Sequence, residues 1–167
     1  KGDGSMRSGF PLVFLDNVQS TSPAIADMNG DGYLDMIFLT RKYSGSSNTC
    51  GPLYKLRVID RSGNHLGGWP ADVDANTPYV RRFNSSGGYA DTTFPKSPEY
   101  FDGWLSSPLV ASIDGDKIPE VVLTGNNGFL YVFNANGSPK NGYPVYAAVA
   151  FTETGVLGDF DHDGSLN

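Results

Sequence analysis

Oxygen-bearing side chains recur at alternate positions in residues 27–35, which read DMNGDGYLD. Calcium binds roughly six to eight oxygen atoms, and a turn that offers a side chain at every second residue can surround the ion. Carboxylates clustered without a cation repel one another, which makes a solvated turn the less favoured interpretation. We predict a calcium site formed by four side chains and by the backbone carbonyl of the seventh residue: Asp27, Asn29, Asp31, Asp35 and, through its carbonyl, Tyr33.

The same spacing returns in residues 159–167, which read DFDHDGSLN. His162 stands where the first loop has a glycine, and we expect it to point to solvent because calcium prefers oxygen ligands. We predict a second calcium site here, formed by Asp159, Asp161, Asp163, Asn167 and the carbonyl of Ser165.

A third copy, in residues 112–120, departs from this pattern. A serine replaces the first aspartate, and Lys117 takes the position of the second glycine. Two interpretations stay open: the loop binds calcium more weakly, or the ammonium group of Lys117 replaces the ion. The candidate ligands are Ser112, Asp114, Asp116, Ile118 and Glu120. In total the sequence predicts two to three structural Ca²⁺ ions.

The elements that would position these loops form a repeat. A glycine hairpin occurs in residues 3–11, 62–70 and 136–144: a turn glycine, a second glycine five positions later, an aromatic residue and a proline. Proline is tolerated at the first residue of a strand, so each hairpin should lead into an outer strand. Hairpins and acidic loops alternate along the chain.

This alternation predicts units of four short antiparallel strands, the layout of a propeller blade. The third strands are expected at residues 53–60 and 129–133, and apolar runs at 36–39 and 121–123 form the second strands. We therefore expect an all-β chain in which residues 1–167 form about two complete blades with a partial blade at each end, an incomplete or open propeller.

The spacing between units is interrupted by an insertion in residues 72–103, between the hairpin of one blade and the next blade. Its aromatic and arginine side chains are types that interfaces favour. The alternative is a variable loop that folds back on its own aromatic residues. Candidate ligand contacts are Tyr79, Arg81, Arg82, Tyr100 and Trp104, and Asn84 begins a glycosylation triplet.

Composition excludes several classes of protein. The formal charge is −6, with 12 basic and 18 acidic residues, so we expect no nucleic-acid partner. No apolar run approaches the roughly 20 residues of a membrane span. Cys50 is the only cysteine, so it can form no disulfide within the chain; it is either a buried thiol or a link to another chain.

The acidic loop with its preceding Ser-Pro, as in residues 22–35, resembles the FG-GAP and VCBS repeats of integrin-α-type β-propellers. In that family the inner hairpin loop binds calcium. The resemblance implies a calcium-braced scaffold located outside the cell or at its surface. The family includes adhesion receptors, lectins and some polysaccharide lyases, so it leaves the ligand open.

Three functions follow as expectations. The first is adhesion or recognition of a protein or glycan ligand, and the alternative is a structural repeat of an extracellular fibre or sheath, assembled from copies of itself. A polysaccharide lyase is less expected, because acid–base catalysis needs a positioned base. The only histidines are His65, in a hairpin, and His162, in a metal loop. We therefore expect no catalysis.

Overall fold

The computed structural model describes residues 2–14, 17–18, 21–43, 52–73, 82–83, 89–90, 105–125, 128–147, 151 and 153–160. All regular structure within these ranges is β, which confirms the all-β prediction. The strands are β1 (Asn17–Val18), β2 (Ala24–Ala26), β3 (Asp35–Tyr43), β4 (Pro52–Ile59), β5 (Ala71–Val73), β6 (Arg82–Phe83), β7 (Tyr89–Ala90), β8 (Leu109–Ala111), β9 (Glu120–Thr124), β10 (Phe129–Phe133) and β11 (Val145–Tyr146).

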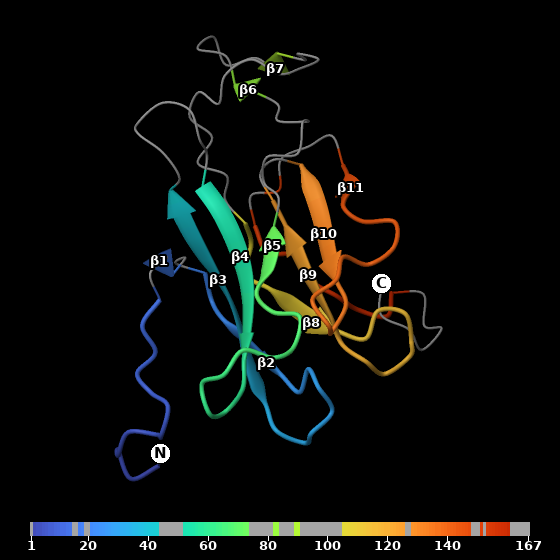
Figure 1. Cartoon of the computed structure of the whole chain (residues 1–167). Coiled ribbons are helices and arrows are strands. Elements are labelled where there is room, and N and C mark those ends of the chain that lie inside the picture. Colours follow the sequence, from blue (N-terminus) through green and yellow to red (C-terminus); the bar gives the residue numbers. More distant parts are fainter. Residues whose placement is uncertain are drawn as a thin grey trace.

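Two antiparallel sheets carry the fold (Figure 1). In the first, β2, β3, β4 and β5 pair in chain order, and β1 joins the same edge of β3 as β2. In the second, β8, β9, β10 and β11 pair in chain order, while β6 and β7 pair only with each other. The predicted third strands are observed as β4 and β10, and β5 and β11 begin directly after the prolines of the second and third hairpins. The outer strand predicted after the first hairpin is not observed at residues 12–14.

The two sheets have the same register. The pair that closes the acidic loop is Ala26 with Asp35 in the first sheet and Ala111 with Glu120 in the second. The third and fourth strands also align equivalently, with Leu56 opposite Ala71 and Leu130 opposite Val145. The units differ in length: β3 and β4 have 9 and 8 residues, whereas β9 and β10 have 5 each.

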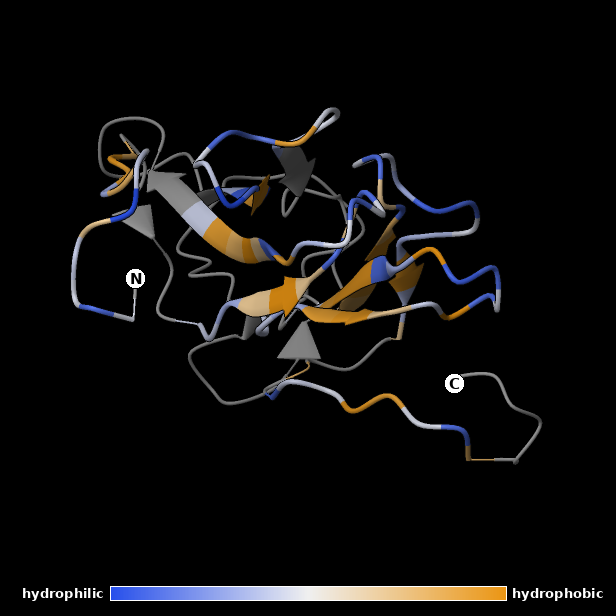
Figure 2. Ribbon diagram, turned by 90° about the horizontal axis from the view of Figure 1, so that it is seen from below, coloured by the Kyte–Doolittle hydropathy of each residue, from blue (hydrophilic) through white to orange (hydrophobic). Residues whose placement is uncertain are grey.

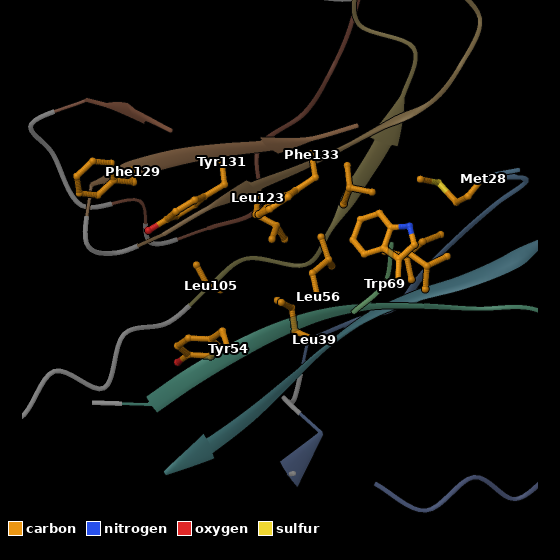
Figure 3. Close-up of a cluster of buried hydrophobic side chains, with 13 residues drawn as sticks. Met28, Leu39, Tyr54, Leu56, Trp69, Leu105, Leu123, Phe129, Tyr131 and Phe133 are labelled. Atoms are coloured by element: carbon orange, nitrogen blue, oxygen red, sulfur yellow. The ribbon is translucent and has the colours of Figure 1, made fainter. Parts of the chain in front are cut away.

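A single hydrophobic core lies between the two sheets (Figure 3). Figure 2 shows the hydrophobic strands facing each other, with hydrophilic turns around them. The first sheet contributes Ile37, Leu39, Tyr54, Leu56 and Val58, and the second contributes Val121, Leu123, Phe129, Tyr131 and Phe133.

The two sheets use opposite faces for this contact. In the shared register Val121 corresponds to Met36, which is next to the core residue Ile37. Val121 is fully buried, whereas Met36 is 39% exposed. One face of the first unit therefore packs against the other face of the second unit, a head-to-tail arrangement that differs from a sandwich of two equivalent faces.

The glycine hairpins stack in the same order as the units. A Cβ at Gly9 would overlap the carbonyl oxygen of Ser62, and a Cβ at Gly68 would overlap that of Asn136. Around the second contact, the indole N–H of Trp69 donates a hydrogen bond of 2.9 Å to the carbonyl of Ala135. The peptide bond before the proline is cis in all three hairpins.

Candidate metal-binding loops

Both described acidic loops connect the first and second strands of a unit, at the end of the sheet where the glycine hairpins also lie (Figure 1). In the first loop the carboxylate of Asp27 organises the turn. Its Oδ1 accepts hydrogen bonds from the backbone N–H groups of Gly30 at 2.8 Å and Asp31 at 3.1 Å, and its Oδ2 accepts one from Gly32 at 2.8 Å. The backbone of the turn therefore wraps around the carboxylate of Asp27, the first residue of the loop.

The second loop repeats this scaffold with different chemistry. The hydroxyl oxygen of Ser112 accepts a hydrogen bond of 2.9 Å from the backbone N–H of Lys117, as Asp27 does from Gly32. Lys117 has a φ of +69°, close to the +81° of Gly32, which is the left-handed conformation that glycine adopts without steric cost. The loop geometry is thus retained although the first aspartate and the second glycine are both replaced.

The fifth positions also correspond. Oδ1 of Asp31 accepts a hydrogen bond of 2.8 Å from the backbone N–H of Tyr33. Oδ1 of Asp116 accepts one of 2.7 Å from Ile118. In each loop the backbone bond uses one carboxylate oxygen. The other oxygen of Asp31, Oδ2, accepts a hydrogen bond of 3.2 Å from the side-chain amide of Asn29.

The ninth position anchors each loop to its sheet. Oδ2 of Asp35 accepts a hydrogen bond of 3.0 Å from the backbone N–H of Met28, and Oε2 of Glu120 accepts one of 3.0 Å from Ile113. Asp35 is 2% exposed and Glu120 is 3% exposed. Buried carboxylates are costly unless they are hydrogen-bonded and paired with positive charge. Each loop therefore requires a positive charge near its buried carboxylate, from a side chain or from a bound cation.

Asp35 lies in a negatively charged setting. Burial raises its pKa above the usual value, the hydrogen bond from Met28 lowers it, and the charges of Asp31, Asp27 and Asp60 raise it further. Among the residues that the structure describes, no lysine or arginine forms an ion pair with Asp27, Asp31 or Asp35. A cation in the first loop would offset this repulsion.

A cationic side chain nevertheless lies beside the first loop. The guanidinium group of Arg61, directly before the second hairpin, stacks over the ring of Tyr33 with its carbon 3.5 Å from the ring centroid. This cation–π contact ties hairpin to loop.

The second loop gathers its carboxylates more tightly. Oxygens of Asp114, Asp116 and Glu120 lie within 4.8 Å of one another, and this is the group of three acidic side chains in the described part of the chain that could hold a metal ion. The side-chain nitrogen of Lys140 lies 2.6 Å from Oδ2 of Asp114 and 3.0 Å from Oε1 of Glu120. The ammonium group at this loop is therefore that of Lys140, from the third hairpin, and not that of Lys117.

The ion pair between Lys140 and the two carboxylates shifts the pKa values of its members. The hydrogen bond from Lys140 is the main cause that holds the pKa of Asp114 below its usual value. In turn Asp114 and then Glu120 raise the pKa of Lys140. The only sequence signal for Lys140 was a charged residue at a hairpin position that holds Leu66 in the second hairpin and Arg7 in the first.

The remaining predicted site residues fall mostly outside the described ranges. In the third loop, Asp159 is described and half-buried. Arg82 lies in β6. The predicted residues outside the described ranges are Asp161, Asp163, Ser165, Asn167, Tyr79, Arg81, Asn84, Tyr100 and Trp104, together with Cys50.

Searches of protein-family models, curated proteins and solved structures find nothing that matches this chain. In the described part of the chain, no helix has the length and apolar character needed to cross a membrane.

Proposed function

We propose that this chain is a calcium-binding segment of β-propeller type that serves adhesion or recognition outside the cell or at its surface, with calcium as a structural ion and without catalysis of its own. The observation that carries the proposal is the first acidic loop. There a buried aspartate lies among like charges, in a turn whose oxygen-bearing side chains alternate with backbone donors.

The packing of the sheets supports propeller-type blades. Each blade of a propeller places one face on the preceding blade and the other on the following blade, as the opposite faces used here would require. Other segments of the same chain also approach the outer faces of the two sheets: the ring of Phe14 packs edge-on against Phe38, with centroids 5.3 Å apart. On the far side, the hydroxyl of Thr124 donates a hydrogen bond of 3.2 Å to the carbonyl of Glu153.

The proposed ligands of the first site are the oxygens of Asp27, Asn29, Asp31 and Asp35 and the carbonyl of Tyr33. Carboxylate, amide and carbonyl oxygens suit Ca²⁺, which accepts flexible geometry and more ligands than Mg²⁺. A bound ion would require these ligands to be held together as they can be only in the folded unit, so its binding free energy would add to the stability of the fold. Weak sites of this kind are practical outside the cell, where calcium is abundant.

Calcium titration by isothermal calorimetry tests the proposal. Asp31→Asn removes one carboxylate from the first loop and should remove one site from the wild-type stoichiometry. Asp3→Asn is the matched control: it makes the same change of charge in a hairpin turn, where Oδ1 of Asp3 accepts the N–H of Ser5 as Oδ1 of Asn136 accepts that of Ser138. Equal stoichiometry for the wild type and Asp31→Asn would contradict the proposal.

Recognition is assigned to the insertion in residues 72–103, whose aromatic and arginine residues suit a protein or glycan ligand. A glycan array and a panel of extracellular-matrix proteins, each probed with the wild-type chain and with a variant in which a short turn replaces residues 74–103 and leaves β5 in place, test this assignment. Binding that is lost in the variant supports the assignment, and binding that survives contradicts it.

The hairpin stack favours a second candidate, a structural repeat that assembles from copies of this chain. In the described part of the chain, no atom lies within 4 Å of a Cβ built at Gly142 or at Gly4. The Asp3-Gly4 turn of one copy could therefore pack against Gly142 of another copy, in the way that the turn at Asn136 packs against Gly68. Light scattering with calcium and then with chelator tests this: a species many times 17.9 kDa supports assembly, and a monomer in both conditions contradicts it.

A further inference from the structure

The side chain of Lys140 enters the second acidic loop from a different element of the same unit. Its hairpin joins β10 to β11 at the end of the sheet where residues 112–120 connect β8 to β9 (Figure 1). The ammonium group lies 2.6 Å from Asp114 and 3.0 Å from Glu120, and the Lys140 side chain is 20% exposed. Distances this short are typical of charge-assisted hydrogen bonds.

The first unit has an apolar residue at the corresponding place. The backbone N–H of Lys140 donates to the carbonyl of Val132 at 2.8 Å, and that of Leu66 donates to Val58 at 3.1 Å. Val132 and Val58 occupy equivalent positions in their sheets, so Lys140 and Leu66 are equivalent residues. Leu66 packs against the hydrophobic core and offers no charge to the first loop.

The two loops therefore share one backbone scaffold and differ in their source of positive charge. We propose that the ammonium group of Lys140 is the resident cation of the second loop, and that Lys140 and a divalent ion are alternative occupants of the cluster formed by Asp114, Asp116 and Glu120. This inference rests on the proposed function, in which such loops are cation sites. It assigns metal to the first loop and an internal ion pair to the second.

The chemistry of the two occupants makes them exclusive. A lysine ammonium is a compact charge with three donors and bridges two carboxylates without a metal. A divalent ion that bound the same oxygens would compete with these hydrogen bonds and would lie close to the ammonium, which it repels. Removing the ammonium leaves three acidic side chains whose oxygens are already within 4.8 Å of one another.

Calcium titration of Lys140→Met in the Asp31→Asn background tests the inference. Methionine keeps an unbranched apolar stem and removes the charge, and the first loop is weakened in the background. We expect the variant to gain one calcium site over its Asp31→Asn parent. Lys117→Gly in the same background is the control, because it removes a positive charge from the same loop without touching the ion pair, and it should gain none.

An Lys140→Met variant that folds but gains no site would overturn the inference. Failure of the proposed function gives a different result: the wild type and Asp31→Asn would then bind the same number of calcium ions. The comparison of Lys140→Met with its Asp31→Asn parent would still test the inference. A second variant covers misfolding of the first: Asp114→Asn in the otherwise wild-type chain should leave the calcium stoichiometry unchanged, and loss of one site would overturn the inference.

Discussion

Gly68 lies directly against the carbonyl oxygen of Asn136, so close that any Cβ at Gly68 would overlap that oxygen. The contact joins the second hairpin to the third, and Gly9 repeats it between the first hairpin and Ser62. Gly63 lies on the other side of that earlier contact, with the carbonyl oxygen of Gly9 3.0 Å from the place of its Cβ. The second glycine of the first and second hairpins thus has a packing function as well as a conformational one, whereas Gly142 in the third hairpin has no such contact within the described residues.

Gly68→Ala should destabilise the chain more than Gly142→Ala. The two glycines have nearly equal φ values of +85° and +89°, so both substitutions carry the cost of about 1–2 kcal/mol for a left-handed L-residue. Only Gly68→Ala adds an overlap with a neighbouring backbone, which typically costs a further ~1–3 kcal/mol. Urea unfolding followed by circular dichroism measures the difference; equal losses for the two variants would show that the hairpin contact is unimportant.

Trp69→Phe should lower the free energy of unfolding by about 1–3 kcal/mol, because it removes buried volume and the hydrogen bond to Ala135. Trp69 is buried, and its ring also lies near Phe133, with centroids 6.4 Å apart. The control is Tyr143→Phe, which changes the equivalent aromatic residue of the third hairpin and should stay within about 0.5 kcal/mol of wild type. Chemical denaturation compares the three proteins, and a Trp69→Phe variant as stable as the control would refute the role of this contact.

Lys117→Gly should stabilise the chain by up to about 1 kcal/mol. The substitution relieves the cost of a positive φ at a non-glycine residue, and the greater freedom of glycine in the unfolded chain offsets part of that gain. Gly32→Lys makes the reverse change in the first loop and should destabilise. Both are measured by urea unfolding in excess chelator; a loss of stability in Lys117→Gly would mean that its side chain contributes to the loop.

Asp60 should make stability depend on pH in the acid range. Its Oδ1 accepts hydrogen bonds of 2.8 Å from the backbone N–H groups of Asn64 and Ser62, and chiefly the bond from Asn64 holds the pKa of Asp60 below its usual value. A lowered pKa contributes stability above the unfolded value of about 3.9, and this stability is lost as pH falls through the lower folded value.

The comparison is with Asp60→Asn, which keeps an oxygen acceptor and removes the titrating charge. The difference in unfolding free energy between wild type and variant should be largest above about pH 4 and should shrink below it. A difference that stays constant from neutral pH into the acid range would contradict the assignment.

Much of the fold followed from local patterns. The turn glycines and aromatic-proline pairs marked the hairpins, and the apolar runs at 36–39 and 121–123 lie in β3 and β9. These features depend on residues close together in sequence, which is where periodicity and turn chemistry are informative. The repeated scaffold of the acidic loops is local too, since each backbone bond spans only a few residues.

The parts that the sequence did not predict depend on distant pairs. Lys140 meets Asp114 across 26 positions and Glu120 across 20, so nothing in the loop indicated which lysine would approach it. The five-residue spacing of the hairpin glycines was evident, but its cause was not. Gly68 must be a glycine because of a carbonyl in the next hairpin, 68 positions along the chain.

Calcium bound in the first loop should stabilise the fold, and thermal unfolding of the calcium-loaded chain before and after addition of excess chelator measures this effect. Wild type and Asp31→Asn are compared in the same buffer, with metal loading verified beforehand. We predict that chelation lowers the melting temperature of the wild type, and by more than it lowers that of Asp31→Asn. A wild-type melting temperature that chelation leaves unchanged would show that calcium has no stabilising role in this fold.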